Sequence, residues 1–242
     1  MEIAQGVHSI GQDAGGHVRC FLVDGGDRLT LVDTLWDADG HRITEEIRRI
    51  GRKVTELAHI VLTHGHRSHL GGLAALKEMS GAEVLCHGWE ADIVEGDRTA
   101  QPIPIVPMRP LRAYLRVYPL QLGAALGVDG HRPCRVDAML ADGDRVGPLR
   151  VLHAPGHTPG HLAFYWPERR VLFTGDAVVT YPLLAPGWPA FTLNRKQACA
   201  SLCRLTELRV DVAAVGHGDA ITTAAADRLL SLTEVAHDQW NG

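Results

Sequence analysis

Histidines gather where apolar stretches of this 242-residue chain end, and the first group is the densest. Residues 64–69 read His-Gly-His-Arg-Ser-His and directly follow the apolar run at 59–63. Three imidazoles this close repel one another when they are protonated, but a metal ion binds them favourably through their neutral nitrogens. The group therefore predicts a metal site where a strand ends, and a solvated histidine-rich loop is the alternative.

Three further segments repeat the pattern of an apolar strand, a glycine and a side chain that can bind metal. His157 and His161 lie in residues 153–166, Asp176 ends the sequence Phe-Thr-Gly-Asp, and His217 lies between two glycines. If the strand ends meet at one sheet edge, these side chains converge with residues 64–69 and supply two adjacent metal positions. Zn²⁺ is the expected ion, and iron or manganese also fits such ligands. An ordinary turn aspartate is the alternative for Asp176.

Strands and helices that could position these groups alternate along the chain. The apolar and β-branched patterns predict strands at residues 17–24, 28–34, 59–62, near 84, and at 145–153, 162–166, 171–174 and 210–215. Helical spacing and capping residues predict helices at residues 38–50, 73–79, near 89, 194–208 and 223–236. Because this alternation occurs twice, we expect two similar halves of an α/β (α+β) protein, packed sheet against sheet.

Residues 97–135 interrupt this alternation. They hold six of the thirteen prolines, and six arginines against two aspartates. A long connection of this kind inside a compact domain is typical of a functional lid. The alternative is a structural arm that makes dimer contacts. Residues 112–122 fit either a strand, with Arg112, Tyr114, Arg116 and Tyr118 on one side, or a helical turn.

Aromatic side chains near these groups suggest a substrate pocket. Five of them are expected to form its walls: Tyr114, Tyr118, Tyr181, Trp188 and Phe191. Together with the arginines of the lid, they favour a small, partly apolar substrate that carries an anionic group. Ordinary packing in the core is the alternative for each.

The order of these motifs resembles the metallo-β-lactamase-fold hydrolase superfamily. Asp33 lies in Leu-Val-Asp-Thr, and the histidine signature, Pro-Gly-His-Thr-Pro-Gly-His, Thr-Gly-Asp and Gly-His-Gly follow in order. The resemblance covers nearly the whole chain outside residues 97–135. It implies one domain, residues 1–242, folded as a four-layer αβ/βα sandwich with an inserted lid. It also implies which residues serve the metals: His64, His66 and His157 the first, His69 and His217 the second, Asp176 both, with Asp33 and His161 as supporting groups.

The chain departs from the family pattern at Ser68, where the family has the signature aspartate. That aspartate binds the second metal and helps to position the attacking hydroxide, whereas a serine hydroxyl is neutral and a poor ligand. We therefore expect weak occupancy of the second position, or a water in place of the missing ligand. Orientation of the hydroxide would then depend on Asp176, with Ser68 exchanging a hydrogen bond but unable to act as a general base unaided.

The resemblance implies a metal-dependent hydrolase in which hydroxide, formed from metal-bound water, cleaves a small ester, lactone, thioester or related bond. A mononuclear iron oxidoreductase that uses His64, His157 and Asp176 is one alternative. The other is a catalytically weak metal-binding scaffold. Metal content and the effect of Ser68→Asp on turnover distinguish the three.

Composition narrows the remaining choices. A net charge of −4 offers no basic face for nucleic acid. Residues 1–11 show no signal peptide, and no apolar run approaches the roughly 20 residues that span a bilayer. Five scattered cysteines favour a reducing cytoplasm. We expect a small-molecule substrate and no membrane partner, and the sequence leaves open a homodimer, with the lid as the surface to examine.

Overall fold

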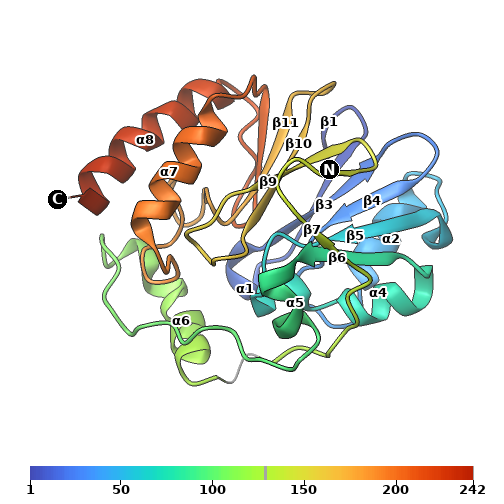
Figure 1. The fold of residues 1–242 in the computed structure, drawn as a ribbon, viewed down its shortest axis with the longest axis horizontal. Helices are drawn as coiled ribbons and strands as arrows, with labels where there is room; N and C mark the ends of the chain where they lie inside the picture. Colours follow the sequence, from blue (N-terminus) through green and yellow to red (C-terminus); the bar gives the residue numbers. More distant parts are fainter. Residues whose placement is uncertain (128–129, 242) are drawn as a thin grey trace.

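Two β-sheets face each other in the computed structural model, which describes residues 1–127 and 130–241. The first sheet runs in chain order through seven strands: β1 (Glu2–Ala4), β2 (Val7–Gly11), β3 (Arg19–Asp24), β4 (Leu29–Val32), β5 (Leu57–Val61), β6 (Glu83–His87) and β7 (Ala138–Leu140). The second has the order β12 (Val212–Val215), β11 (Val171–Gly175), β10 (Leu162–Trp166), β9 (Leu149–His153) and β8 (Arg145–Val146). The two sheets form the middle layers of the molecule (Figure 1).

Helices cover the outer face of each sheet. The first sheet carries α2 (His41–Arg49), α4 (Leu73–Ser80) and α5 (Gly88–Val94), and the second carries α7 (Arg195–Thr206) and α8 (Ala225–Asn241) (Figure 1). Short helical pieces complete the chain: α1 (Ala14–His17), α3 (Arg67–Leu70), α6 (Tyr118–Ala125) and the 3₁₀ turns η1 (Val54–Glu56) and η2 (Ala113–Arg116). This arrangement confirms the expected four-layer αβ/βα sandwich.

Three apolar cores separate the four layers because side chains alternate along each strand. On β3, Leu22 faces the helices of the first half, whereas Phe21 faces the second sheet and lies edge-on to Phe173, with ring centroids 5.5 Å apart. On β11, Leu172 points the other way, toward α7 and α8. Each sheet is therefore apolar on both faces, which is why its strands read as nearly continuous apolar runs.

Several boundaries differ from the expected ones for local reasons. The expected strand at 17–24 begins at Arg19, because His17 has a left-handed φ of 53° and ends α1. The expected single strand at 145–153 is two, since Gly147 has a φ of 55° and turns the chain so that Val146 pairs with Leu149. The helix expected from Asn194 is present, and the Asn194 side chain accepts the Gln197 N–H at 3.0 Å.

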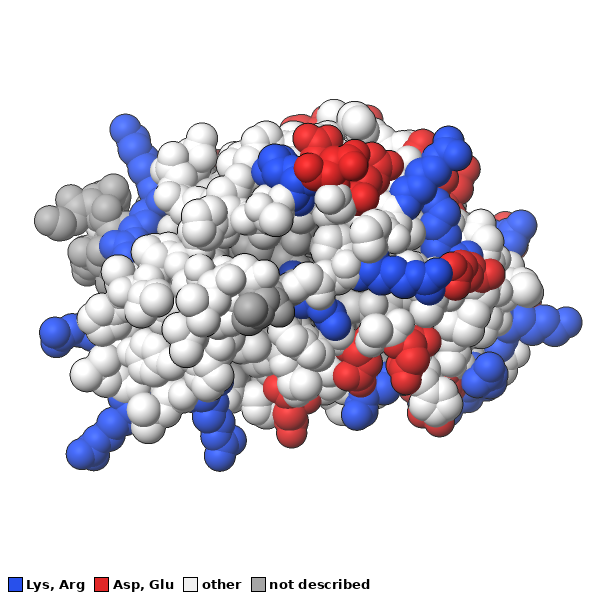
Figure 2. Space-filling view, turned by 90° about the horizontal axis from the view of Figure 1, so that it is seen from below, with Lys and Arg blue, Asp and Glu red and all other residues white. Residues whose placement is uncertain are grey.

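Residues 97–127 and 130–135 lie between α5 and β7 and pass along the lower side of the molecule in Figure 1. Residues 112–118 are helical and not extended, so the alternative of a strand is wrong there. Seen from below, the half of the surface on the α6 side is largely uncharged, with basic side chains at its edge (Figure 2). Within the described residues, no helix is both long enough and apolar enough to cross a membrane.

Candidate metal centre

The ends of two parallel strand pairs meet at one edge of the sandwich. Strand β4 lies parallel to β5, and β11 lies parallel to β12, so the residues that follow them leave their sheets on the same side. Backbone hydrogen bonds join the halves there, among them Leu162 N–H to the Thr63 carbonyl and Arg19 N–H to the Gly216 carbonyl, both at 2.8 Å. The expected convergence of the metal-binding segments follows from this topology.

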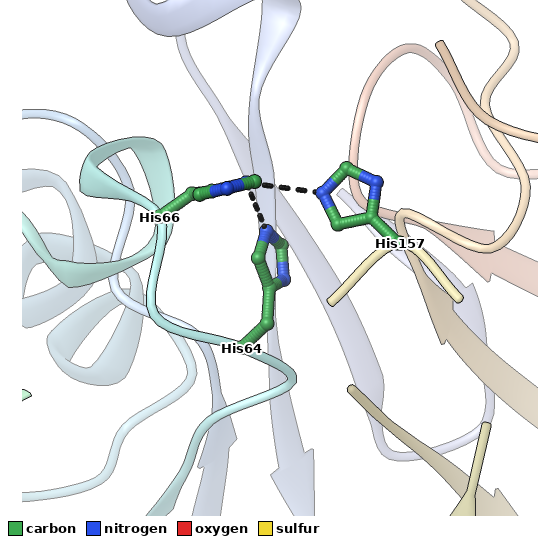
Figure 3. Close-up of side chains that lie close together, drawn as sticks. All are labelled: His64, His66 and His157. Atoms are coloured by element: carbon green, nitrogen blue, oxygen red, sulfur yellow. Dashed lines mark hydrogen bonds between the residues drawn. The ribbon is translucent and has the colours of Figure 1, made fainter. Parts of the chain in front are cut away.

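Three imidazoles form the first candidate position. His66 Nδ1 lies 3.0 Å from His64 Nε2 and 3.0 Å from His157 Nε2 (Figure 3). Nitrogens that share a tetrahedral zinc ion through bonds of about 2.0–2.1 Å lie about 3.3 Å apart. The three rings meet at steep angles, with His64 and His66 at 85°, so each directs one nitrogen toward a common point. His66 and His157, which are 91 positions apart in the chain, thus form a tripod of ligands with His64.

Asp176 lies between this tripod and a second pair of imidazoles. Its Oδ2 is 3.5 Å from His157 Nε2 and 3.2 Å from His217 Nε2, and its Oδ1 is 3.4 Å from His69 Nε2. His64, His69 and Asp176 form a second group, whose ligand atoms all lie within 4.8 Å of one another. The carboxylate therefore faces both candidate positions.

Hydrogen bonds on the far side of three rings fix which nitrogen faces the site. Thr63 Oγ1 donates to Asp33 Oδ2, so it can accept from His64 Nδ1 at 3.0 Å. His69 Nδ1 donates to the same carboxylate oxygen at 2.9 Å, and His217 Nδ1 donates to the Gly16 carbonyl at 2.8 Å. In each ring the Nε2 lone pair is left for a metal, which is the usual role of such outer partners.

Two supporting residues lie beside the candidate ligands. Asp33 accepts hydrogen bonds from Thr63 through both carboxylate oxygens and from His69 Nδ1. Asp33 therefore holds the ring of His69 directly and the ring of His64 through Thr63, where β4 and β5 end. His161 Nε2 accepts the Asp176 N–H at 3.1 Å, so it positions the backbone of the shared carboxylate. Gly175 is required in this turn, because its φ is 50° and a Cβ there would lie 2.6 Å from His161 Nε2.

Burial and charge set the protonation of the site. Burial, together with the neighbouring imidazoles, holds the pKa of His64 well below its usual range, and burial lowers the pKa of His66 to about 4. Burial also lowers the pKa of His69, but the carboxylates of Asp33 and Asp176 outweigh it and raise that pKa to about 10. Burial raises the pKa of Asp176, yet His217 and His69 hold it well below its usual range. In the absence of a metal, the tripod is therefore neutral, and the imidazolium of His69 balances the neighbouring carboxylates.

The unpaired atoms of the site fit a metal ion. Among the described residues, His69 Nε2 and Asp176 Oδ1 are buried without a hydrogen-bond partner. A buried polar atom without a partner is unfavourable by about 1–3 kcal/mol, and metal coordination removes that penalty. Imidazole nitrogen and carboxylate oxygen are donors that zinc, iron and manganese accept. The residues present therefore suit one or two such ions.

Glu90 is a buried residue of the site that the sequence did not reveal. It is completely buried on α5, and its Oε2 accepts the Gly65 N–H at 3.0 Å. Its Oε1 accepts the Thr158 hydroxyl and the Gly160 N–H, so one carboxylate holds both histidine loops. Burial raises the pKa of Glu90, and these three hydrogen bonds oppose that shift. In the sequence it looks like an ordinary helix acid, because its partners lie 25 to 70 positions away.

A cavity of about 250 Å³ opens beside the candidate ligands His66, Asp176 and His217. Ser68, Trp188 and Phe191 are among its lining residues, so Ser68 lies where the expected catalytic group would be.

The three tyrosines that were expected in the pocket are not among the residues that line this cavity. Tyr114 is buried in an apolar cluster that joins residues 103–117 to residues 179–191, and the Tyr118 hydroxyl donates to the Met108 carbonyl. Tyr181 lies against the ring of His17, with centroids 4.1 Å apart. Each tyrosine is held by a partner of its own, which the linear sequence does not show.

Comparison with known proteins agrees with this geometry. The model of the metallo-beta-lactamase superfamily matches residues 13–217. The probable metallo-hydrolase YflN of Bacillus subtilis is 27% identical, over 96% of this chain and 94% of its own. A hydroxyacylglutathione hydrolase of Pseudomonas aeruginosa is 33% identical over 69% of this chain, which spans only 45% of that enzyme.

Solved structures show the same fold. The metallo-beta-lactamase family protein TTHA1429 of Thermus thermophilus superimposes with a TM-score of 0.69 at 26% identity, over 98% of this chain and 81% of its own. TTHA1623, solved in a di-iron-bound form, superimposes with a TM-score of 0.66 at 26% identity, over 94% of this chain and 97% of its own. The chain belongs to the metallo-beta-lactamase superfamily, as the order of its motifs predicts.

Proposed function

We propose that this protein is a metal-dependent hydrolase that cleaves a small ester, lactone, thioester or related bond. One observation carries the proposal: four strand ends bring five imidazoles and one carboxylate together. Four of the imidazoles and Asp176 form two groups of ligand atoms that share His64, and His217 Nε2 lies 3.2 Å from Asp176 Oδ2. A site that only stabilises the fold needs four ligands. The names of the relatives, a probable metallo-hydrolase and a hydroxyacylglutathione hydrolase, support hydrolysis of an acyl bond.

The distances around Asp176 suggest how the ligands would divide between two ions. His64, His66 and His157 would hold the first ion, and His69 and His217 would hold a second that shares Asp176. Zinc is the expected metal for both. Ions held there supply Lewis acidity, which lowers the pKa of water and stabilises negative charge on a carbonyl oxygen.

The chain's own groups orient the reactants. Asp176 stays ionised, so it can accept a hydrogen bond from the attacking water. Ser68 lines the same cavity and can donate or accept a hydrogen bond there, but it supplies no charge. Asp33 and Gly16 orient His69 and His217 from behind. This arrangement suits hydrolysis in which positioning depends on Asp176 and not on a second aspartate.

Two alternatives make different use of the same residues. A mononuclear iron oxidoreductase would use His64, His157 and Asp176 and leave two buried imidazoles without a role. A metal-binding scaffold would bind ions and catalyse nothing. The di-iron form of TTHA1623 keeps iron among the candidate metals for this chain.

Metal analysis and a substrate panel test the proposal. We expect protein purified without added metal to carry one to two equivalents of zinc, and to hydrolyse members of an ester, lactone and thioester panel. A chelator should abolish turnover and zinc should restore it. His66→Ala should lose both metal and turnover, whereas His41→Ala, at an exposed histidine, should keep both. One equivalent of iron with oxygen consumption would support the oxidoreductase, and metal without turnover would support the scaffold.

A small-molecule substrate, a cytoplasmic location and a homodimer remain predictions of the sequence. So does the role of residues 97–135 as a lid. Size-exclusion chromatography tests the oligomeric state, and cell fractionation tests the location in the cell.

A further inference from the structure

The cavity beside the candidate metal centre is polar at one end only. His66, Asp176 and His217 line it where the candidate ligands lie. Elsewhere the wall consists mainly of apolar side chains, including Trp36, Trp188 and Phe191. A substrate placed with its reacting bond at the ligands must therefore put an apolar group in the rest of the cavity.

Helix α6 supplies one wall of this cavity. Leu120, Gly123 and Ala124 line it at spacings of three and four residues, which place side chains on one face of a helix. Leu122 is on the same helix but is 49% exposed and lies outside the lining. Gly123 has no side chain and Ala124 has a single methyl group, so a larger residue at either position would make the cavity shallower.

Polar contacts hold α6 in place. Gln121 is buried, and its Nε2 donates to the Pro104 carbonyl at 2.7 Å and the Val106 carbonyl at 3.0 Å. Tyr118 is tied to Met108, whose N–H donates to the tyrosine hydroxyl at 3.1 Å. The wall is therefore a defined surface that can select a substrate by size.

A glycine pair lies beside the cavity, where Leu120 of α6 approaches Trp188. Gly15 and Gly16 have φ values of 73° and 83°, which favour glycine. A Cβ on Gly16 would lie 2.5 Å from the Trp188 ring and 2.9 Å from Leu120 Cδ1. The Gly16 carbonyl also accepts from His217 Nδ1. Gly16 thus orients His217 through its carbonyl, and its lack of a side chain leaves room between Trp188 and Leu120.

The charged groups in the lining are engaged by the protein. Asp176 belongs to the candidate metal centre. The guanidinium of Arg67 donates to the Trp36 and Gly130 carbonyls and lies over the Trp36 ring, 4.6 Å from its centroid. A charged substituent would lose its hydration against an apolar wall, which is unfavourable, so the geometry favours an uncharged group.

The size of the cavity limits that group. An apolar protein cavity of about 150 Å³ accepts benzene. By proportion, the 250 Å³ here takes about ten non-hydrogen atoms. We infer that this site takes substrates with an uncharged, apolar acyl or alkyl group of up to about ten carbon atoms, whose limit is set by α6. The reaction rests on the function proposed above, but binding of the apolar group does not.

Calorimetry with straight-chain primary alcohols, from butanol to tetradecanol, tests the binding step on the metal-loaded and the metal-free protein. Each buried methylene should tighten binding about fourfold, and the gain should stop when the chain fills the cavity. Ala124→Leu should move that limit to shorter chains, and Leu120→Ala should move it to longer ones. Leu122→Ala is the matched control on the exposed side of α6 and should leave the series unchanged.

Gly123→Ala is a second, milder variant that adds one methyl group to the wall. Alanine is favoured over glycine in a helix, so this variant should fold, and it too should shorten the limit. Affinity that does not change with chain length in the wild type overturns the inference. The inference is also overturned if the longest chain that still gains affinity changes by the same amount in Leu122→Ala as in Ala124→Leu.

Hydrolysis of a matching series of straight-chain esters separates this inference from the proposed function. If both hold, kcat/KM rises with acyl length to the limit found by calorimetry and falls in Ala124→Leu. Length-dependent binding without turnover of any ester, lactone or thioester would refute hydrolysis and support the apolar site. Turnover that is independent of acyl length would support hydrolysis and refute the apolar site.

Discussion

Replacing Glu90 should loosen the candidate metal centre without touching any of its ligands. The carboxylate accepts one hydrogen bond from the loop that carries His64 and His66, and two from the loop that carries His157. In Glu90→Gln the shape is kept, but the amide NH₂ must face groups that are themselves donors. At least one buried donor then has no acceptor, and each such loss amounts to about 1–3 kcal/mol.

We therefore expect Glu90→Gln to lower the free energy of unfolding of the metal-free protein by about 2–3 kcal/mol. The loss should also appear in metal binding, because the two loops hold opposite sides of the tripod. Changes in groups that orient ligands typically weaken metal binding about 10- to 100-fold. Urea unfolding of the metal-free protein measures the first effect, and zinc titration against a competing chelator measures the second.

Asp92→Asn is the matched control. Asp92 is an acid on the same helix whose side chain is exposed, so its conversion to an amide should change stability by no more than about 0.5 kcal/mol. The reasoning fails if Glu90→Gln unfolds at the same urea concentration as the wild type and binds zinc equally well. A loss of the same size in Asp92→Asn would also refute it, because the effect would then belong to α5 in general.

Three further predictions follow from the supporting groups. Ser68→Asp should add a charged ligand and tighten the second zinc equivalent by on the order of tenfold or more, and unchanged zinc titrations would contradict the assignment of that position. Asp33→Asn should weaken the same equivalent about 10- to 100-fold by releasing His69 Nδ1, with wild-type affinity as the contrary result. Burial lowers the pKa of His161 to about 4, from an unfolded value near 6.5, so its neutral form stabilises the fold above pH 6.5 and this share is lost as the pH falls toward 4. Between pH 6.5 and 4, the metal-free wild type should therefore lose about 3 kcal/mol more of its free energy of unfolding than the metal-free His161→Asn protein does. Equal losses in the two proteins would refute the burial argument.

Local patterns predicted most of the secondary structure because they report burial and capping directly. Ile43 and Ile47 lie on the buried face of α2, as their spacing requires. Predictions failed where a single backbone torsion or a distant contact decided the outcome. The turn at Gly147 divides one expected strand into two, and the helical form of residues 112–118 follows from packing that periodicity does not show.

The candidate ligands were predictable because their chemistry is unusual in sequence. Histidine and aspartate directly after apolar strands and glycines have few structural uses, so their type and order already indicated a shared metal site. The altered second position at Ser68 was indicated only by the resemblance to the superfamily. The surrounding groups carry no such signal. Glu90 resembles any helix acid. The tyrosines at 114 and 118 resemble pocket residues, although they pack in an apolar cluster beside the cavity and do not line it.

By itself, then, the amino-acid sequence determined the layered α/β architecture, the identity of the candidate ligands and the absence of the family's aspartate, because each is written in residue type and short spacing. Only the tertiary structure decided which nitrogen of each imidazole faces the site, that one carboxylate on α5 holds both histidine loops, and that small residues of α6 shape the cavity. Those features depend on contacts between residues far apart in the chain, and such contacts exist only after the two sheets have packed together.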